Sequence, residues 1–144
     1  MYFSELTLPE QLRNGIEDAG FTVCTPIQEQ TLQLSLAGRD IAGQAQTGTG
    51  KTAAFLITLF TRLLATGDPS KTSRQPRALI LAPTRELVVQ IDKDAQVLGR
   101  YCNLVTQAIY GGVDYMKQRN ALRDGADIVT NKSFSAPCGK SGWA

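Results

Sequence analysis

The sequence predicts an α/β fold in which a parallel sheet carries helices on both faces. Two observations lead to this fold class. Short apolar segments typical of buried strands alternate with amphipathic segments of helical period, and helix-length connections separate the strands. In addition, 42% of the 144 residues are hydrophobic, which suffices for one buried core. The alternation continues to about residue 130, so we expect a single domain over residues 1–130.

Two helices are expected before the first strand. Apolar residues spaced three or four apart predict a short helix over residues 9–18, and Gly20 ends it. A threonine that can cap a helix, followed by a proline in the first turn, predicts a second helix from Pro26 to about Leu36.

A strand, a glycine-rich loop and a long helix come next. Ile41–Ala45 are predicted to form a short buried strand, and QTGTGKT to form a loop. The apolar run Lys51–Ala65 predicts a helix. Residues 67–76 contain no apolar side chain and several helix breakers, so they are expected to form a surface loop.

The second half of the chain repeats the alternation of strand and helix. Three more strands and two more helices are expected, the strands over 77–82, 104–110 and 126–130 and the helices over 85–98 and 114–123. From Asn131 the sequence has no period and is rich in serine and glycine. We therefore expect residues 131–144 to be an unrelated, unstructured tail.

Composition narrows the class of protein. Lys and Arg number 15 and Asp and Glu 13, so the net charge of +2 decides nothing about a polyanionic partner. There is no histidine, and the three cysteines are too far apart in sequence for a zinc pattern: Cys24, Cys102 and Cys138. The N-terminal residues lack the pattern of a signal peptide, and the longest apolar run is too short to span a bilayer. A cytoplasmic protein with no membrane contact is expected.

The segment AQTGTGKT lies between a predicted strand and a predicted helix, the context of a phosphate-binding loop. Its glycines let backbone N–H groups and the helix N-terminus surround a phosphate chain. Lys51 offers charge to the terminal phosphates and Thr52 a hydroxyl to Mg²⁺, and these two are the candidate catalytic residues. The residues expected to hold the phosphates are Thr47, Gly48, Thr49, Gly50, Lys51 and Thr52. One position departs from the general phosphate-loop pattern, because its first glycine is replaced here by Ala45. The alternative interpretation is a glycine-rich turn with a solvated lysine.

The segment GFTVCTPIQ precedes this loop and can recognise a base. The ring of Phe21 can stack on a base, and the carboxamide of Gln28 can pair with the donor and acceptor edge of adenine. Taken alone, Phe21 is as readily a core residue and Gln28 a helix-surface residue. Upstream of a phosphate loop, the pair predicts that the nucleotide is ATP.

A second set of candidate residues follows two of the predicted strands. Thr84 and Arg85 stand at the carboxyl end of a strand, where doubly wound sheets bind ligands, and Arg85 can contact a phosphate. The N–H groups of Gly111 and Gly112 can also receive a sugar-phosphate chain without reading bases. Alternatively, Arg85 pairs with a nearby acidic side chain and the glycines only turn the chain.

Together these motifs resemble the N-terminal RecA-like domain of the DEAD-box ATP-dependent RNA helicases. GFTVCTPIQ resembles the family's Q motif, with Cys24 in place of the usual proline, and Phe3 resembles the aromatic residue upstream of it. AQTGTGKT resembles the first ATP motif, including its alanine. PTREL from Pro83 and the doublet Gly111-Gly112 resemble the motifs that follow.

The resemblance runs from Phe3 to about Thr130 and implies a RecA-like P-loop fold, ATP and Mg²⁺ as cofactors, and RNA as a partner. It implies RNA-backbone contacts from Pro83, Thr84, Arg85, Gly111 and Gly112. Segments such as LAGRDIAGQAQ are most similar to bacterial members linked to RNA degradation. That similarity implies the RNA-degradation machinery as a partner of the full-length protein.

The resemblance ends after ADIVT, where the family continues with Thr-Pro-Gly-Arg and this sequence continues with NKS. The Asp-Glu-Ala-Asp strand and the second domain with its arginine finger do not follow, and no other acidic pair is placed to face the phosphate loop. We therefore expect an incomplete domain that binds ATP and RNA but does not hydrolyse ATP or unwind RNA by itself. The alternatives are an ATP- or RNA-binding module without catalysis and a nonfunctional, frameshifted fragment.

Overall fold

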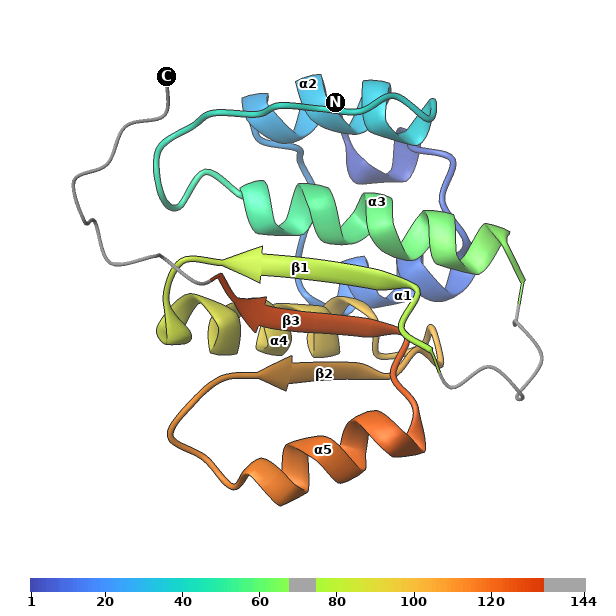
Figure 1. The fold of residues 1–144 in the computed structure, drawn as a ribbon. Coiled ribbons are helices and arrows are strands. Elements are labelled where there is room, and N and C mark those ends of the chain that lie inside the picture. Colours follow the sequence, from blue (N-terminus) through green and yellow to red (C-terminus); the bar gives the residue numbers. More distant parts are fainter. Residues whose placement is uncertain (68–74, 134–144) are drawn as a thin grey trace.

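The computed structural model describes residues 1–67 and 75–133, and within them the predicted α/β class is confirmed. Three parallel strands form one sheet, and five α-helices accompany it (Figure 1). Most of the expected surface loop over 67–76 and the last residues of the expected tail, 134–144, lie outside the described residues. No helix in the described part is long and apolar enough to cross a membrane.

The first two helices are α1, Glu10–Asp18, and α2, Pro26–Leu36, as the sequence predicted. A turn of 3-10 helix over Phe3–Glu5 precedes them. Thr25 caps α2, since its Oγ1 accepts a hydrogen bond from the N–H of Gln28 at 3.4 Å. An isolated antiparallel bridge between Tyr2 and Val23 holds the N-terminus against the segment that leads into α2.

The sheet has the order β1-β3-β2, with β1 at Ala78–Ala82, β3 at Ile128–Lys132 and β2 at Thr106–Ile109. All pairs are parallel, so helices must connect the strands. The long helix α3, Lys51–Ala65, precedes β1 and α4, Arg85–Leu98, follows it. In the figure the starts of α3 and α4 and the ends of the strands lie at the same edge (Figure 1).

One face of the sheet is well covered and the other is not. Helix α4 packs on all three strands and contributes to the core through Val88, Ile91, Ala95 and Leu98. On the opposite face Leu79 and Leu81 of β1 are 63% and 60% exposed. Helix α5, Tyr115–Asp124, contacts β2, and its Leu122 shares a shallow hollow with Leu79. The expectation of helices on both faces is thus met fully on one face only.

The predicted strand Ile41–Ala45 is wrong, because the structure has no strand over these residues. A strand needs a partner for its backbone N–H and C=O groups. Ile41 and Gly43 instead line a groove of about 1170 Å³, which is also lined by Phe55 and by Leu81 of β1. The segment is largely exposed, while the helix predicted after it forms with its predicted bounds.

Strand β3 begins and ends two residues later than predicted. Asn131 pairs with Leu81 and Lys132 with Ala82, and the N–H of Ser133 donates to the carbonyl oxygen of Ala82 at 2.7 Å. Strand pairing thus includes the first residues of the segment expected to be unstructured. Backbone pairing depends little on side-chain periodicity, which explains why the apolar pattern placed the boundary too early.

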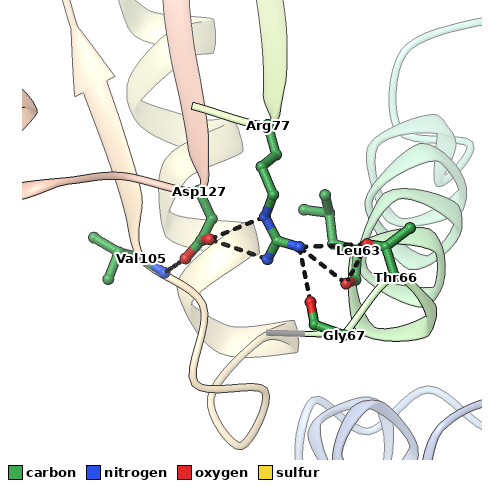
Figure 2. A network of polar contacts seen from close by, with 6 residues as sticks. All are labelled: Leu63, Thr66, Gly67, Arg77, Val105 and Asp127. Carbon is green, nitrogen blue, oxygen red and sulfur yellow. Dashed lines mark hydrogen bonds and ion pairs between the residues drawn. The ribbon is translucent and has the colours of Figure 1, made fainter. Parts of the chain in front are cut away.

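Polar contacts join the starts of the three strands in what we call the basal network: Leu63, Thr66, Gly67, Arg77, Val105 and Asp127 (Figure 2). Nε and Nη2 of Arg77 donate to Oδ1 of Asp127 at 3.2 and 3.0 Å, and the N–H of Val105 donates to Oδ2 at 2.9 Å. Nη1 of Arg77 donates to the carbonyl oxygens of Leu63 and Gly67, each at 3.2 Å. The network connects the sheet to the C-terminal end of α3.

The two described cysteines, Cys24 and Cys102, are buried free thiols. Burial raises the pKa of Cys102 to about 11. It is also the main cause of the raised pKa of Cys24. Both therefore serve as small core residues rather than as reactive groups.

Candidate functional site

The expected phosphate loop leads directly into the N-terminus of α3. Gly48 and Gly50 adopt left-handed φ angles of 78° and 86°, which glycine reaches without strain. The loop therefore curls tightly before the helix begins at Lys51. The Nζ of Lys51 donates to the carbonyl oxygens of Ala45 and Gln46. Lys51 is the first residue of this 15-residue helix, whose N-terminal N–H groups and positive dipole end favour a bound anion.

The segment expected to read adenine lies against this loop. The carboxamide of Gln28 donates from Nε2 to the carbonyl oxygen of Gly50 at 3.2 Å and accepts at Oε1 from the N–H of Thr25 at 2.9 Å. Oγ1 of Thr25 donates to the carbonyl oxygen of Thr49 at 2.8 Å. Gln28 is only 1% exposed. A carboxamide keeps a second N–H and a second lone pair after these contacts.

These contacts of Gln28 were not anticipated from the sequence. The capping-box pattern, a threonine followed three residues later by glutamine, could have predicted the bond between Gln28 and Thr25. The contact with Gly50 joins residues 22 positions apart, and no local pattern encodes it.

Phe21 is placed so that it can contact a ligand. Its ring centroid lies 5.9 Å from that of Phe3 with the rings tilted by 46°, and Phe3 is buried. Phe21 itself is 36% exposed. It lines the large groove that also includes the phosphate-loop residues Thr47, Gly48, Gly50, Lys51 and Thr52. One cavity therefore brings together the aromatic ring and the loop.

The second set of candidates meets at the carboxyl ends of β1 and β2. Thr84 caps α4, accepting at Oγ1 from the N–H of Leu87 at 3.2 Å, so Arg85 begins that helix and is exposed. The guanidinium carbon of Arg85 lies 4.9 Å from the centroid of the Tyr110 ring. A Cβ on Gly112, whose φ is 83°, would come within 2.9 Å of Nη1 of Arg85.

The structure thus brings Arg85 and Gly112 together, with Pro83 and Gly111 exposed nearby in sequence. The alternative pairing of Arg85 with Glu86 or Asp92 is not among the ion pairs of the described residues. Tyr110 was not anticipated as part of the site. Its position as the last residue of a predicted strand, before a glycine doublet, was the available signal.

A family of known proteins matches most of this chain. The model of the DEAD/DEAH box helicase family matches residues 25–134, which include the phosphate loop and the residues after both strands. The chain belongs to the DEAD/DEAH box helicase family. Its α/β architecture is accordingly that of a RecA-like helicase domain, as the resemblance implied.

Individual relatives agree with this family assignment. ATP-dependent RNA helicase RhlB of Pasteurella multocida is 54% identical over 127 residues, 88% of this chain and 30% of the relative. The protein of the same name from Xanthomonas oryzae is 54% identical over 130 residues, 88% of this chain and 22% of the relative. The chain therefore spans less than a third of the length of these helicases.

Two solved helicase structures share the fold. The RNA-helicase Prp28 from Chaetomium thermophilum, bound to ADP, superposes with a TM-score of 0.81 at 38% identity, over 91% of this chain and 32% of that one. A hypothetical ATP-dependent RNA helicase from Sulfolobus tokodaii gives a TM-score of 0.73 at 33% identity, over 87% of this chain and 34% of that one.

The residues present suit a magnesium ion that a nucleotide brings with it. Within the described ranges, no group of three or more His, Cys, Asp or Glu side chains could hold a metal ion. Mg²⁺ in nucleotide sites often has one or two protein ligands and takes the others from phosphates and water. Thr52, at the first turn of α3 beside Lys51, supplies a suitable hydroxyl.

Proposed function

We propose that the chain is an ATP- and RNA-backbone-binding part of an ATP-dependent DEAD-box RNA helicase that does not turn over ATP or unwind RNA by itself. The observation that carries this proposal is the hydrogen bond from Gln28 to the carbonyl oxygen of Gly50. It joins the base-recognition segment to the phosphate loop, so that the two can receive one nucleotide. The RNA role rests on the family and on the placement of Arg85.

Each nucleotide-site residue has a separate role in this proposal. Phe21 stacks on the base, and the remaining hydrogen-bonding capacity of Gln28 recognises adenine. The loop residues Thr47, Gly48, Thr49 and Gly50 present backbone N–H groups to the phosphates, and Lys51 turns its ammonium from the loop carbonyls to the terminal phosphates. Thr52 would hold Mg²⁺, which would neutralise charge on the phosphates.

RNA binds through its sugar-phosphate backbone at the carboxyl ends of β1 and β2. Arg85 donates to a phosphate, and Pro83, Thr84, Gly111 and Gly112 shape the surface beside it. Contacts of this kind position a strand but do not read its bases. Binding is therefore independent of sequence.

The proposed lack of turnover is supported by the residues that follow the described strands at their carboxyl ends. Hydrolysis needs a carboxylate that places Mg²⁺ and the attacking water. The residues directly after the three described strands are Pro83, Tyr110 and Ser133, none of which is acidic. Asp127, by contrast, precedes β3 and is held in the basal network at the opposite end of the sheet.

The proposed cellular setting rests on the sequence resemblance. Because segments such as LAGRDIAGQAQ resemble bacterial helicases linked to RNA degradation, the full-length protein is proposed to act in the cytoplasm and to have RNA-degradation machinery among its partners. The second candidate function is an ATP- or RNA-binding module without catalysis. It differs from the first in that the chain would act as an independent binding protein and not as part of a helicase.

Calorimetry with ATP and with GTP, run beside a phosphate-release assay with and without RNA, tests the proposal. We expect ATP to bind in preference to GTP and no RNA-stimulated phosphate release. Lys51→Ala should weaken ATP binding by roughly 10-fold or more, because a charge-assisted contact to phosphate is lost. RNA-stimulated release that disappears in Lys51→Ala would overturn the absence of turnover, and equal binding of ATP and GTP would overturn the role of Gln28.

A further inference from the structure

We infer that Tyr110 and Gln118 are positioning residues that hold the Arg85 guanidinium ready for an RNA phosphate. The inference rests on the proposed RNA role of Arg85 and adds residues that neither the motifs nor the sequence reasoning singled out. The three side chains come from separate parts of the fold: Arg85 from α4, Tyr110 from the position directly after β2 and Gln118 from α5.

Gln118 first fixes the backbone of Tyr110. The N–H of Tyr110 donates to Oε1 of Gln118 at 3.1 Å, and Nε2 of Gln118 donates to the carbonyl oxygen of Tyr110 at 2.9 Å. The pairing of β2 with β3 ends one residue earlier, at Ile109. The carboxamide of Gln118 thus takes the place of a neighbouring strand, satisfying both backbone groups of Tyr110.

Helix α5 is itself anchored where it presents Gln118. Asp114 caps the helix, because its Oδ1 accepts from the N–H groups of Met116 and Lys117 at 2.9 and 3.4 Å. Gln118 lies one turn further along, half-buried on the face toward Tyr110. The segment from Tyr110 to Gln118, which includes the glycine doublet and the start of α5, therefore forms a loop closed by the hydrogen bonds between these two residues.

Tyr110 in turn supports the guanidinium of Arg85. The guanidinium carbon lies 4.9 Å from the ring centroid, within the range of about 6 Å for a cation–π contact. The half-buried tyrosine also packs against the hydrophobic core, so the ring is a fixed surface rather than a mobile one. A guanidinium held by its face keeps its N–H donors available for a phosphate.

Gly112 lies next to the same guanidinium group of Arg85. Its φ of 83° suits glycine, and the space where a Cβ would stand is only 2.9 Å from Nη1 of Arg85. The guanidinium thus lies between an aromatic ring and a bare backbone. Holding a long side chain in place before binding removes part of its ordering cost, which corresponds to roughly 2- to 10-fold in affinity.

Titration of a fluorescent oligouridine with the 144-residue chain and its variants tests this inference. Tyr110→Leu removes the ring and should weaken RNA binding roughly 2- to 10-fold, and Tyr110→Phe should restore most of that loss because it keeps the ring face. Gln118→Leu should weaken binding in the same direction without altering Arg85 or the ring. ATP affinity, measured by calorimetry on each variant, reports whether the fold is retained.

Two further measurements separate positioning from a general loss of structure. In an Arg85→Ala background Tyr110→Leu should have no additional effect, because its role acts through Arg85. The salt dependence of RNA binding should keep its slope in Tyr110→Leu but become shallower by roughly 0.7 in Arg85→Ala, which loses a phosphate contact.

The possible failures are distinguishable. Unchanged RNA binding in Arg85→Ala would overturn the proposed RNA site together with this inference. Weakened binding in Arg85→Ala with unchanged binding in both Tyr110→Leu and Gln118→Leu would overturn the inference alone. An equal effect of Tyr110→Leu in the presence and absence of Arg85 would also overturn it, as would failure of Tyr110→Phe to restore affinity.

Discussion

The two ends of the sheet are built in opposite ways. At the amino end, Arg77, Val105 and Asp127 directly precede the three strands, and their polar groups are joined to one another in the basal network (Figure 2). At the carboxyl end, Arg85 and the glycine doublet are exposed. The amino end uses its polar groups for internal contacts, while the carboxyl end leaves its groups available for a ligand. Ligands of open α/β sheets bind at that carboxyl end.

One helix connects the two ends. The basal network holds the last turn of α3 through the carbonyl oxygen of Leu63 and the residue after its C-cap through the carbonyl oxygen of Gly67. The N-terminal turn of the same helix carries Lys51 and Thr52. The same helix therefore contributes to the basal network near its C-terminal end and to the candidate phosphate site at its N-terminal end. Changes at the base should therefore lower stability most, and changes at the site should act on binding.

The largest expected effect is the loss of Asp127. Asp127→Ala leaves the Arg77 guanidinium partly buried without its carboxylate and also removes the acceptor of the Val105 N–H group. The paired side chains are only 19% and 25% exposed. We expect the free energy of unfolding to fall by about 3 kcal/mol, at the lower end for buried ion pairs. Urea denaturation followed by circular dichroism measures this change.

The chain offers a matched control in the pair Arg100–Asp18, whose atoms are 3.8 Å apart and whose side chains are 69% and 44% exposed. Arg100→Ala should cost less than about 0.5 kcal/mol, because exposed pairs contribute little. The double variant Arg77→Ala with Asp127→Ala should be less destabilised than the sum of the single variants. Equal, small losses for both pairs would remove the contrast between the two ends.

The second effect concerns two glycines of the phosphate loop. Ala at position 50 would place a Cβ 2.3 Å from Nε2 of Gln28, so Gly50→Ala must displace that side chain as well as strain the backbone. Gly48→Ala meets no atom within 4 Å and has strain alone. We expect losses in unfolding free energy of about 2–3 kcal/mol for Gly50→Ala and about 1–2 kcal/mol for Gly48→Ala. Equal losses would show that Gln28 is not held by the loop.

The sequence predicted the helices better than the strands, for a physical reason. The starts of α2, α3 and α4 follow from local features such as Thr25 before a proline, Gly50 before Lys51 and Thr84 as a cap. A strand needs a partner distant in sequence. The segment Ile41–Ala45 has the apolar content of a strand, but it lines a groove and does not pair with another strand.

The candidate site shows the same division. Lys51, Gln28 and Arg85 were predicted as site residues because each belongs to a short motif that is recognisable from residue types and their spacing along the chain. The contact of Gln28 with Gly50 and that of Arg85 with Tyr110 both depend on the packing of separate elements. Residue types indicate what a site can bind, whereas the supports that orient its side chains become visible only in three dimensions.

A smaller effect is expected from Gln28→Glu, which tests whether the loop contact also serves recognition. The variant keeps an acceptor for the N–H of Thr25 but loses the donor to Gly50 and to an adenine acceptor. We expect both affinities to fall, because the loop contact is lost for either nucleotide, and the ratio of ATP to GTP affinity to fall roughly 5-fold, since one further hydrogen bond is lost only for adenine. Calorimetry measures both, and Gln30→Glu on the exposed face of α2 is the control. Equal losses for ATP and GTP would make Gln28 a structural residue only.

The smallest expected effect is the response of RNA binding to salt. Its slope measures how many charged contacts the carboxyl end of the sheet makes with RNA. Each phosphate contact to single-stranded RNA gives a log-log slope of roughly −0.7. Arg85 is the one basic side chain among the proposed RNA-contacting residues, so the expected slope is about −0.7 for the whole interface. A fourfold rise in salt should then weaken binding only about 2.6-fold.

Lys93→Ala, on the exposed surface of α4, should leave this slope unchanged, whereas Arg85→Ala should bring it close to zero. A slope several times steeper in the unaltered chain would mean that basic residues of α5, such as Lys117 and Arg119, also hold the RNA. The carboxyl end would then be a broad electrostatic surface instead of a single oriented contact.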